Sequence, residues 1–161
     1  KLVSQQFKKL VSGKNIAIKH IDAEKISSEQ FEKTKNSLYA CSDLALATSG
    51  TVVLELAKAS VPMIVGYRAG FLTQFIYRLL VKVSSANLVN LITKSDNIPE
   101  FLFFRCNSKN FYDEAIKILE KNLYSEAQLI SSKEAIRELG YGSKDPSVRA
   151  AKSIKTYFKL D

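Results

Sequence analysis

Residues 46–68 read LATSGTVVLELAKASVPMIVGYR, and this stretch decides the fold. An apolar run is followed by a corner of small residues at 49–51 and then by a second apolar stretch that contains one acid, Glu55. The first run and the run at 62–67 are continuously apolar, as strands buried on both faces are. The segment between them has the length and apolar spacing of a short helix. The pattern therefore predicts a strand, a helix and a second, parallel strand.

The same alternation continues on both sides of this stretch, and it predicts an α/β fold with a parallel sheet. Ser27 and Gln30 have the spacing of a capping box, which places a helix start there. After residue 107 the pattern becomes entirely helical. We expect strands at 15–20, 43–48 and 62–67, helices at 2–12, 27–41, 50–60, 72–82, 108–121, 125–138 and 146–159, and an extended or looped segment at 87–92.

Composition restricts the class of protein but does not select a function. The 161 residues suit one compact domain with a packed core, and the net charge of +8 with a pI near 9.4 favours an anionic partner. The two cysteines, Cys41 and Cys106, and the single His20 form a poor set of metal ligands. We expect two reduced thiols, no metal site and no cofactor. No apolar run approaches the roughly 20 residues that a membrane-spanning helix needs.

The corner formed by Ser49, Gly50 and Thr51 follows the first predicted strand at its carboxyl end. Ligands of parallel α/β sheets bind beyond this end of the strands. Small residues let an anion approach backbone N–H groups, and the two hydroxyls can donate hydrogen bonds to it. The alternative is that Ser49 or Gly50 merely caps a helix. The corner alone leaves both a phosphate site and a cap open.

Glu55 lies about one helical turn after this corner, so it can face the same crevice. A carboxylate there can accept hydrogen bonds from two sugar hydroxyls, as acids do in ribose recognition. The alternative is a surface pair with Lys58, three residues further on, which contributes only about 0.2–0.5 kcal/mol. Both interpretations of Glu55 remain open at this point.

A long segment without acids follows Glu55 and ends at Asp96. Within it, basic residues alternate with aromatic ones, and the predicted helix there can form a membrane-surface patch that meets anionic lipid. An ordinary core helix with solvated basic ends explains the pattern as well. A nucleic-acid patch is a third reading, but no known nucleic-acid-binding signature supports it. The residues proposed for membrane or acyl-chain contact are Phe71, Phe75, Arg78 and Lys82.

Several stretches together resemble a known family. SGTVVLELAKASVPMIVGYR (49–68), RLLVK (78–82), NLVNLI (87–92) and IPEFL (98–102) are similar to the C-terminal half of lipid-A-disaccharide synthase, and the likeness runs from about 36 to 119. It implies half of a GT-B fold, which has two Rossmann-like domains: a parallel sheet with helices on both faces, plus a helical C-terminal tail. We expect a UDP-sugar-binding domain at 1–107 and a helical segment at 108–161 that packs on it or on a partner. The family's N-terminal acceptor domain is not represented.

The resemblance also implies an activity. The family transfers 2,3-diacylglucosamine from UDP-2,3-diacylglucosamine to lipid X (diacylglucosamine 1-phosphate), giving lipid A disaccharide and UDP. It works in the cytoplasm, as a peripheral protein on the inner membrane of Gram-negative bacteria, by direct displacement with inversion and without a metal. This chain would hold the donor nucleotide, contain no catalytic residue and be inactive alone. A homodimer is compatible with the long helical tail.

Roles for individual residues follow from the same resemblance. Ser49, Gly50 and Thr51 would meet the diphosphate, and Glu55 would hold the ribose of UDP. The remaining donor-site residues would be Arg68, Asn90 and Glu100. The family's Gly-Arg-like element is replaced here by TKSD (93–96), which leaves details of uridine recognition open. The competing hypothesis is a non-catalytic basic module that binds anionic membrane or nucleic acid, with a steep salt dependence.

Overall fold

The computed structural model describes residues 5, 9, 12, 17–19, 21–68, 85–143 and 145–158. The chain divides into two compact units, Lys1–Leu38 and Tyr39–Asp161. The predicted helix at 72–82 lies outside the described residues, and so do Phe71, Phe75, Arg78 and Lys82. The division at residue 107 into a nucleotide-binding part and a helical segment stays a prediction.

The first unit contains a short 3-10 helix, η1 (Ala23–Lys25), and most of α2 (Ser28–Ala40). The predicted capping box is confirmed: the Gln30 backbone N–H donates to Ser27 Oγ and the Ser27 N–H donates to Gln30 Oε1, both at 3.3 Å. The predicted strand at 15–20 is wrong for its described residues, because 17–19 belong to no strand. This segment has only six residues, and short apolar runs of that kind do not by themselves determine a strand.

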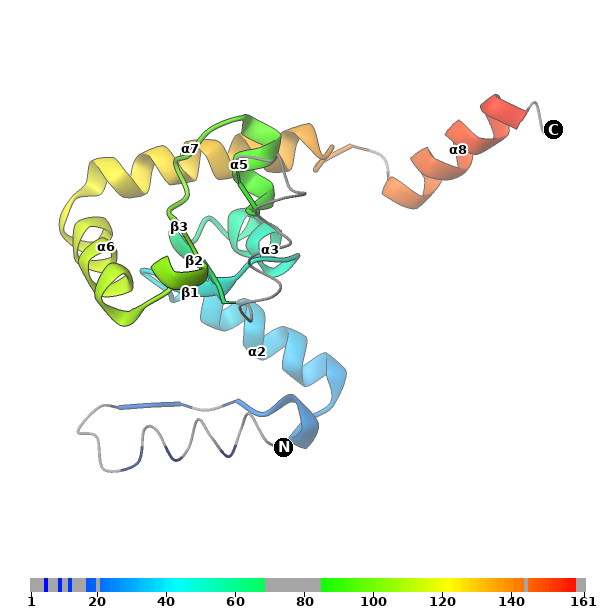
Figure 1. Cartoon of the computed structure of the whole chain (residues 1–161). Helices are drawn as coiled ribbons and strands as arrows, with labels where there is room; N and C mark the ends of the chain where they lie inside the picture. The colour runs from blue at the N-terminus through cyan, green and yellow to red at the C-terminus, as the bar shows by residue number, and fades with distance from the viewer. Residues whose placement is uncertain are drawn as a thin grey trace. The chain divides into compact units, whose positions relative to one another are not determined.

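The second unit is built around a parallel sheet, which confirms the predicted α/β class (Figure 1). Its described strands are β1 (Ala45–Thr48), β2 (Met63–Tyr67) and β3 (Glu100–Leu102), in the spatial order β1-β2-β3. Thr48 is paired with Gly66, and Val65 is paired with Glu100. The carboxyl ends of β1 and β2 therefore reach the same edge of the sheet, where the corner at 49–51 begins.

The helices of the second unit agree with the sequence pattern except at one place. The described elements are α3 (Val52–Lys58), α5 (Leu88–Thr93), η2 (Phe103–Arg105), α6 (Ser108–Glu120), α7 (Asn122–Glu138) and α8 (Pro146–Phe158). The prediction of an extended or looped segment at 87–92 is wrong, because most of it forms α5. Asn87 starts this helix by accepting a hydrogen bond from the Val89 N–H at 2.9 Å.

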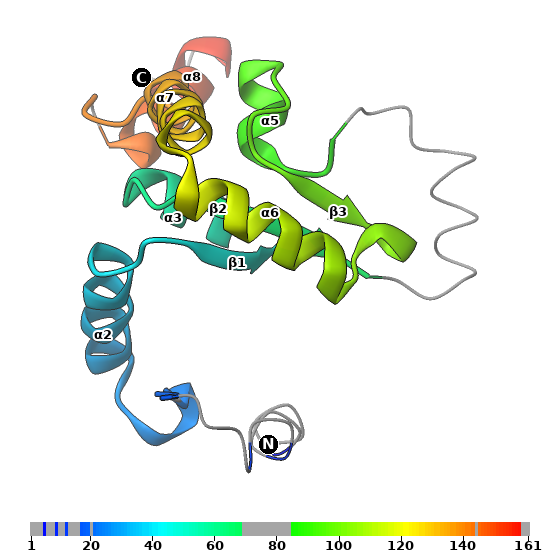
Figure 2. The same cartoon turned by 90° about the vertical axis from the view of Figure 1, so that its left-hand side faces the viewer.

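Helices lie on both faces of β2, which is buried as its apolar sequence predicts. The prediction of a strand buried on both faces is wrong for β1, where alternate residues are exposed and Leu46 is 64% exposed. On one face α3, α5 and α7 pack together over the core that contains Val53, Met63, Val65, Val89 and Ala135. On the other face α6 packs against β2, where Ile64 and Phe101 meet Ile118 (Figure 2). The chain thus has a Rossmann-like arrangement with a helix-covered parallel sheet. Among the described residues no helix is long and apolar enough to cross a membrane.

Candidate functional site

The corner after β1 is open and lies beyond the carboxyl end of the sheet. Gly50 has a φ of +151°, and a Cβ added to it would meet no atom within 4 Å. Thr51 precedes α3 and makes no side-chain capping bond to it. The cap position of α3 therefore belongs to Thr51, and the alternative of a cap at Ser49 or Gly50 is wrong. Gly50 and Thr51 are both exposed, so the backbone of the corner is accessible to a ligand.

Ser49 holds the corner to the segment that leads into α5. Its Oγ donates a hydrogen bond of 2.7 Å to the carbonyl oxygen of Ala86. Because the Ser49 hydroxyl has this backbone partner, the position of the corner depends on residues 85–87. The sequence pattern gave no indication of this contact, since the partner is a backbone group 37 residues further along the chain.

Glu100 fixes the same segment from the other side. Its carboxylate accepts a hydrogen bond from Ser85 Oγ at 2.7 Å and bonds from the Ala86 N–H at 3.0 and 3.1 Å. Ala86 is therefore bonded by its carbonyl to Ser49 and by its N–H to Glu100. The structure joins these two predicted site residues through one shared neighbour. Charge-assisted bonds of this kind are stronger than neutral ones.

Asn90 is held within the protein by both ends of its amide. Its Nδ2 donates to the carbonyl oxygen of Ile98 at 2.9 Å, and its Oδ1 accepts from the Ile98 N–H at 3.1 Å. Asn90 is 4% exposed and Ile98 is 1% exposed. The amide thus connects α5 to the segment before β3 by two hydrogen bonds. These bonds indicate a structural role for Asn90.

Glu55 is half-buried in α3, one turn after the corner. The hydroxyl of Tyr39, in the last turn of α2, donates to Glu55 Oε2 at 3.2 Å. Tyr39 thus contacts a candidate site residue, and the sequence pattern did not predict this contact because a tyrosine at the end of a helix gives no specific signal. The alternative partner of Glu55, Lys58, has its ammonium 4.9 Å from the centre of the Tyr141 ring.

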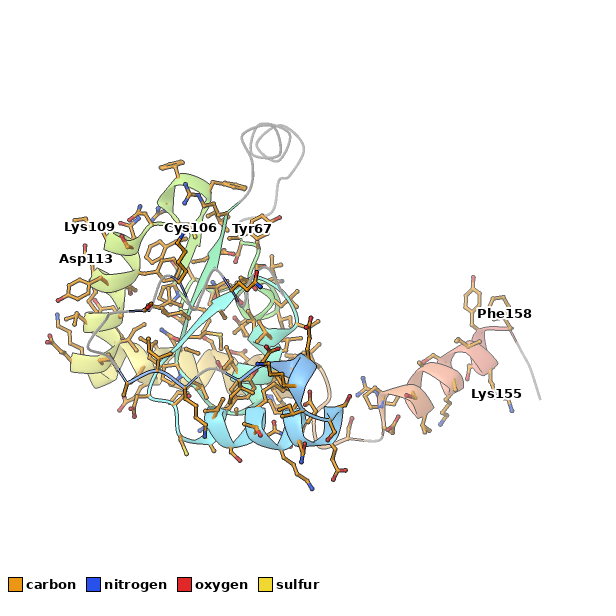
Figure 3. The ribbon with its side chains drawn as sticks, turned by 90° about the horizontal axis from the view of Figure 1, so that it is seen from below. Tyr67, Cys106, Lys109, Asp113, Lys155 and Phe158 are labelled. Carbon is orange, nitrogen blue, oxygen red and sulfur yellow. The ribbon has the colours of Figure 1, made fainter. Side chains whose placement is uncertain are left out.

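Arg68 follows β2 directly and is exposed. The preceding residue, Tyr67, lies at the carboxyl end of β2 (Figure 3). Its ring makes an edge-to-face contact with that of Phe103, at 6.3 Å between ring centres. Arg68 therefore supplies a positive charge at the sheet edge that also carries the corner. Among the described residues no group of three side chains is arranged to hold a metal ion.

The fold and these residues define a class of protein: a Rossmann-like α/β domain that carries Ser49, Gly50, Thr51 and Arg68 just after the carboxyl ends of β1 and β2, where such domains bind ligands. Comparison of the sequence with known protein families narrows this class. The chain belongs to the family described as lipid-A-disaccharide synthetase, whose model matches residues 1–154.

Curated relatives agree with this assignment. The chain is 37% identical over 129 residues to a lipid-A-disaccharide synthase from Rickettsia felis, an alignment that covers 80% of this chain and 33% of the relative. It is 38% identical over 121 residues to the same enzyme from Rickettsia prowazekii, covering 74% of this chain and 32% of the relative. The chain therefore spans about a third of the length of the relatives that it matches.

Proposed function

We propose that this chain is the donor-nucleotide-binding part of a glycosyltransferase of lipid A biosynthesis. The reaction is transfer of 2,3-diacylglucosamine from UDP-2,3-diacylglucosamine to lipid X, giving lipid A disaccharide and UDP. The observation that carries the proposal is the open corner at 49–51, in a chain of this family, with the Glu55 carboxylate one turn away. The corner follows the carboxyl end of β1 directly, where nucleotides bind in Rossmann-like folds.

The residues divide into ligand contacts and supports. The accessible backbone of Gly50 and Thr51, with the Thr51 hydroxyl, would bind the diphosphate, and Glu55 would accept hydrogen bonds from the ribose. Arg68 would stabilise the negative charge that builds on UDP as it leaves. The side chains of Ser49, Asn90 and Glu100 have protein partners. We therefore propose that Asn90 and Glu100 are positioning residues. For Ser49 we propose two roles, as a positioning residue and as a contact of the diphosphate.

The full-length protein would act on lipid-linked substrates at the cytoplasmic surface of the inner membrane. The charge of +8 on this chain supports attraction to anionic lipid headgroups. The segment with Phe71, Phe75, Arg78 and Lys82 is the proposed membrane or acyl contact, and it lies outside the described residues. A homodimer is part of the same proposal. Because the chain spans about a third of its relatives, we propose that the 161 residues bind UDP without transferring sugar.

The test is calorimetric titration of UDP into the 161-residue chain, with ADP as the control ligand. Selective UDP binding is expected. Glu55→Gln should weaken it about ten- to a hundredfold, because a hydrogen bond to a charged group contributes about 1.5–3 kcal/mol. Glu134→Gln, which changes an exposed acid on α7, is the matched control and should bind like the wild type.

Two results would overturn this proposal. The first is equal affinity for UDP and ADP, with the steep salt dependence of a general polyanion site. That outcome would favour the basic module that binds membrane or nucleic acid. The second is an affinity for UDP that Glu55→Gln leaves unchanged. Activity is measured in parallel with both lipid substrates, and transfer by the 161-residue chain alone would contradict the proposed inactivity.

A further inference from the structure

Two aromatic side chains meet at the carboxyl edge of the sheet. Tyr67 is the last residue of β2, and Phe103 follows the end of β3. Tyr67 is paired with Leu102, so the two aromatic residues leave neighbouring strands at the same level. Their edge-to-face contact has an angle of 74° between the ring planes. Tyr67 is nevertheless 42% exposed, which leaves part of this residue accessible to a ligand (Figure 3).

The backbone of Phe103 is strained. Its φ is +56°, a left-handed value that bulky side chains rarely adopt. Glycine adopts this conformation at much lower cost, so a turn after β3 does not by itself require an aromatic residue. Strained residues gather at active sites and ligand clamps, where the surrounding structure holds them. The strain therefore supports a role for the Phe103 ring beyond the turn.

Tyr67 belongs to the face of the sheet on which α3 and α5 pack. Side chains alternate along a strand, and Met63 and Val65, four and two residues before Tyr67, lie in the core of this face. Glu100, which is paired with Val65, bonds to the N–H of Ala86. Tyr67 is therefore on the side of the sheet that also carries the segment bonded to the corner.

The strand order gives the direction in which a bound sugar nucleotide would extend. The proposed phosphate corner follows β1, Arg68 follows β2 and Phe103 follows β3, and the strands lie in the order β1-β2-β3. Glu55, the proposed ribose contact, is instead bonded to Tyr39 in the helix before β1. With the ribose at Glu55 and the diphosphate between the corner and Arg68, the sugar on the second phosphate would reach the ends of β2 and β3.

The chemistry of the proposed donor matches an aromatic pair at this place. The donor sugar carries two acyl chains, whereas the diphosphate and ribose are charged or rich in hydroxyls. Aromatic side chains offer a large apolar contact area, and tyrosine adds a hydroxyl that can bond to a sugar. Uracil at Tyr67 would require the ribose to lie there too, away from Glu55. The pair therefore fits the acylated sugar better than the base.

We propose that Tyr67 contacts the acylated sugar of the donor nucleotide and that Phe103 is a positioning residue that fixes the Tyr67 ring for this contact. The inference rests on the proposed donor function. It adds to that function a contact that selects an acylated sugar nucleotide over UDP alone.

The test compares two ligands on the 161-residue chain by calorimetry. They are UDP and a dihexanoyl analogue of UDP-2,3-diacylglucosamine, used below the concentration at which it aggregates. The analogue should bind about five- to tenfold more tightly than UDP, as expected of one aromatic contact. Tyr67→Ala should bind UDP like the wild type and lose this preference. Tyr112→Ala, which removes a 67% exposed tyrosine of α6, is the matched control and should keep it.

Two substitutions of Phe103 separate its ring from its backbone. Phe103→Gly removes the ring and relieves the strain at a φ of +56°. This variant should keep the far-UV spectrum and the UDP affinity of the wild type and lose most of the preference for the analogue. Phe103→Tyr keeps an aromatic ring beside Tyr67 and should retain the preference, which a purely structural role of the turn would not explain.

The outcomes distinguish failure of this inference from failure of the proposed function. If the wild type does not bind UDP, the donor function is overturned and this inference with it. If UDP binds but the analogue binds no more tightly, or if Tyr67→Ala keeps the preference, only this inference is overturned. It is also overturned if Tyr67→Ala loses affinity for UDP itself, because the ring would then contact the nucleotide rather than the sugar.

Discussion

Substitution of Asn90 gives the sharpest prediction, because a structural role and a ligand-binding role would change different quantities. The first would lower the free energy of unfolding, and the second would lower the affinity for UDP. Asn90→Ala removes both hydrogen bonds to the Ile98 backbone. Ile98 is 1% exposed, so water does not replace the lost partner and two buried backbone groups are left unsatisfied. Each such group costs about 1–3 kcal/mol. We expect the free energy of unfolding to fall by about 2–5 kcal/mol, a large part of the stability of a small domain.

The assay is equilibrium unfolding in urea, followed by far-UV circular dichroism. The midpoint should fall while the slope with urea stays near that of the wild type, because the surface exposed on unfolding is unchanged. Asn110→Ala is the control: it removes one solvent-exposed hydrogen bond, from Nδ2 to the Arg105 carbonyl at 2.8 Å, and should cost about 1 kcal/mol or less. The reasoning is refuted if Asn90→Ala is as stable as Asn110→Ala and instead loses UDP affinity.

Three further predictions concern packing, pH and the support of Glu55. Gly66→Ala should destabilise the fold by about 1–3 kcal/mol in urea unfolding, because the added methyl overlaps the Phe111 ring; Phe111→Leu in the same chain should recover part of the loss. Hydrogen bonds from the Ser147 backbone and hydroxyl hold the pKa of Asp145 below its usual range, so this cap stabilises α8 above pH 4 and the stability is lost as the pH falls below about 4. Amide chemical shifts of α8 should follow this loss in the wild type but not in Asp145→Ala. Tyr39→Phe removes the hydroxyl that donates to the Glu55 carboxylate and should weaken UDP binding several-fold in calorimetry, and unchanged affinity would show that this contact does not position Glu55.

The sequence was sufficient for the elements that have a strong apolar pattern. β1 and β2 are short runs that are apolar on both faces, and the corner between β1 and α3 follows from small residues. α5 was missed because NLVNLI has only six residues and no helical period can be read over so few. Its signal was the cap, Asn87, immediately before the run. β3 has three residues and includes a charged one, so it carries no recognisable strand pattern.

Part of the candidate site was predictable, because some of its residues are close neighbours in the sequence. Ser49 and Glu55 belong to one local corner, so their neighbourhood follows from sequence spacing. The contacts that hold the corner are long-range and use backbone groups, as at Ala86, and no side-chain pattern reports them. The contacts of Asn90 and Glu100 likewise appear only when the chain has folded, because each side chain bonds to backbone groups that lie 8 and 14 residues away in the sequence, respectively.

The most direct test of the central claim is to map UDP on the 161-residue chain by two-dimensional nitrogen–proton NMR. UDP should shift the amides of residues 49–55, 68 and 85–86 and leave the whole of α8 unchanged. ADP should cause much smaller shifts at the same amides. Shifts spread over the basic surface, or confined to residues away from the corner after β1, would contradict the assignment of this corner as the nucleotide site.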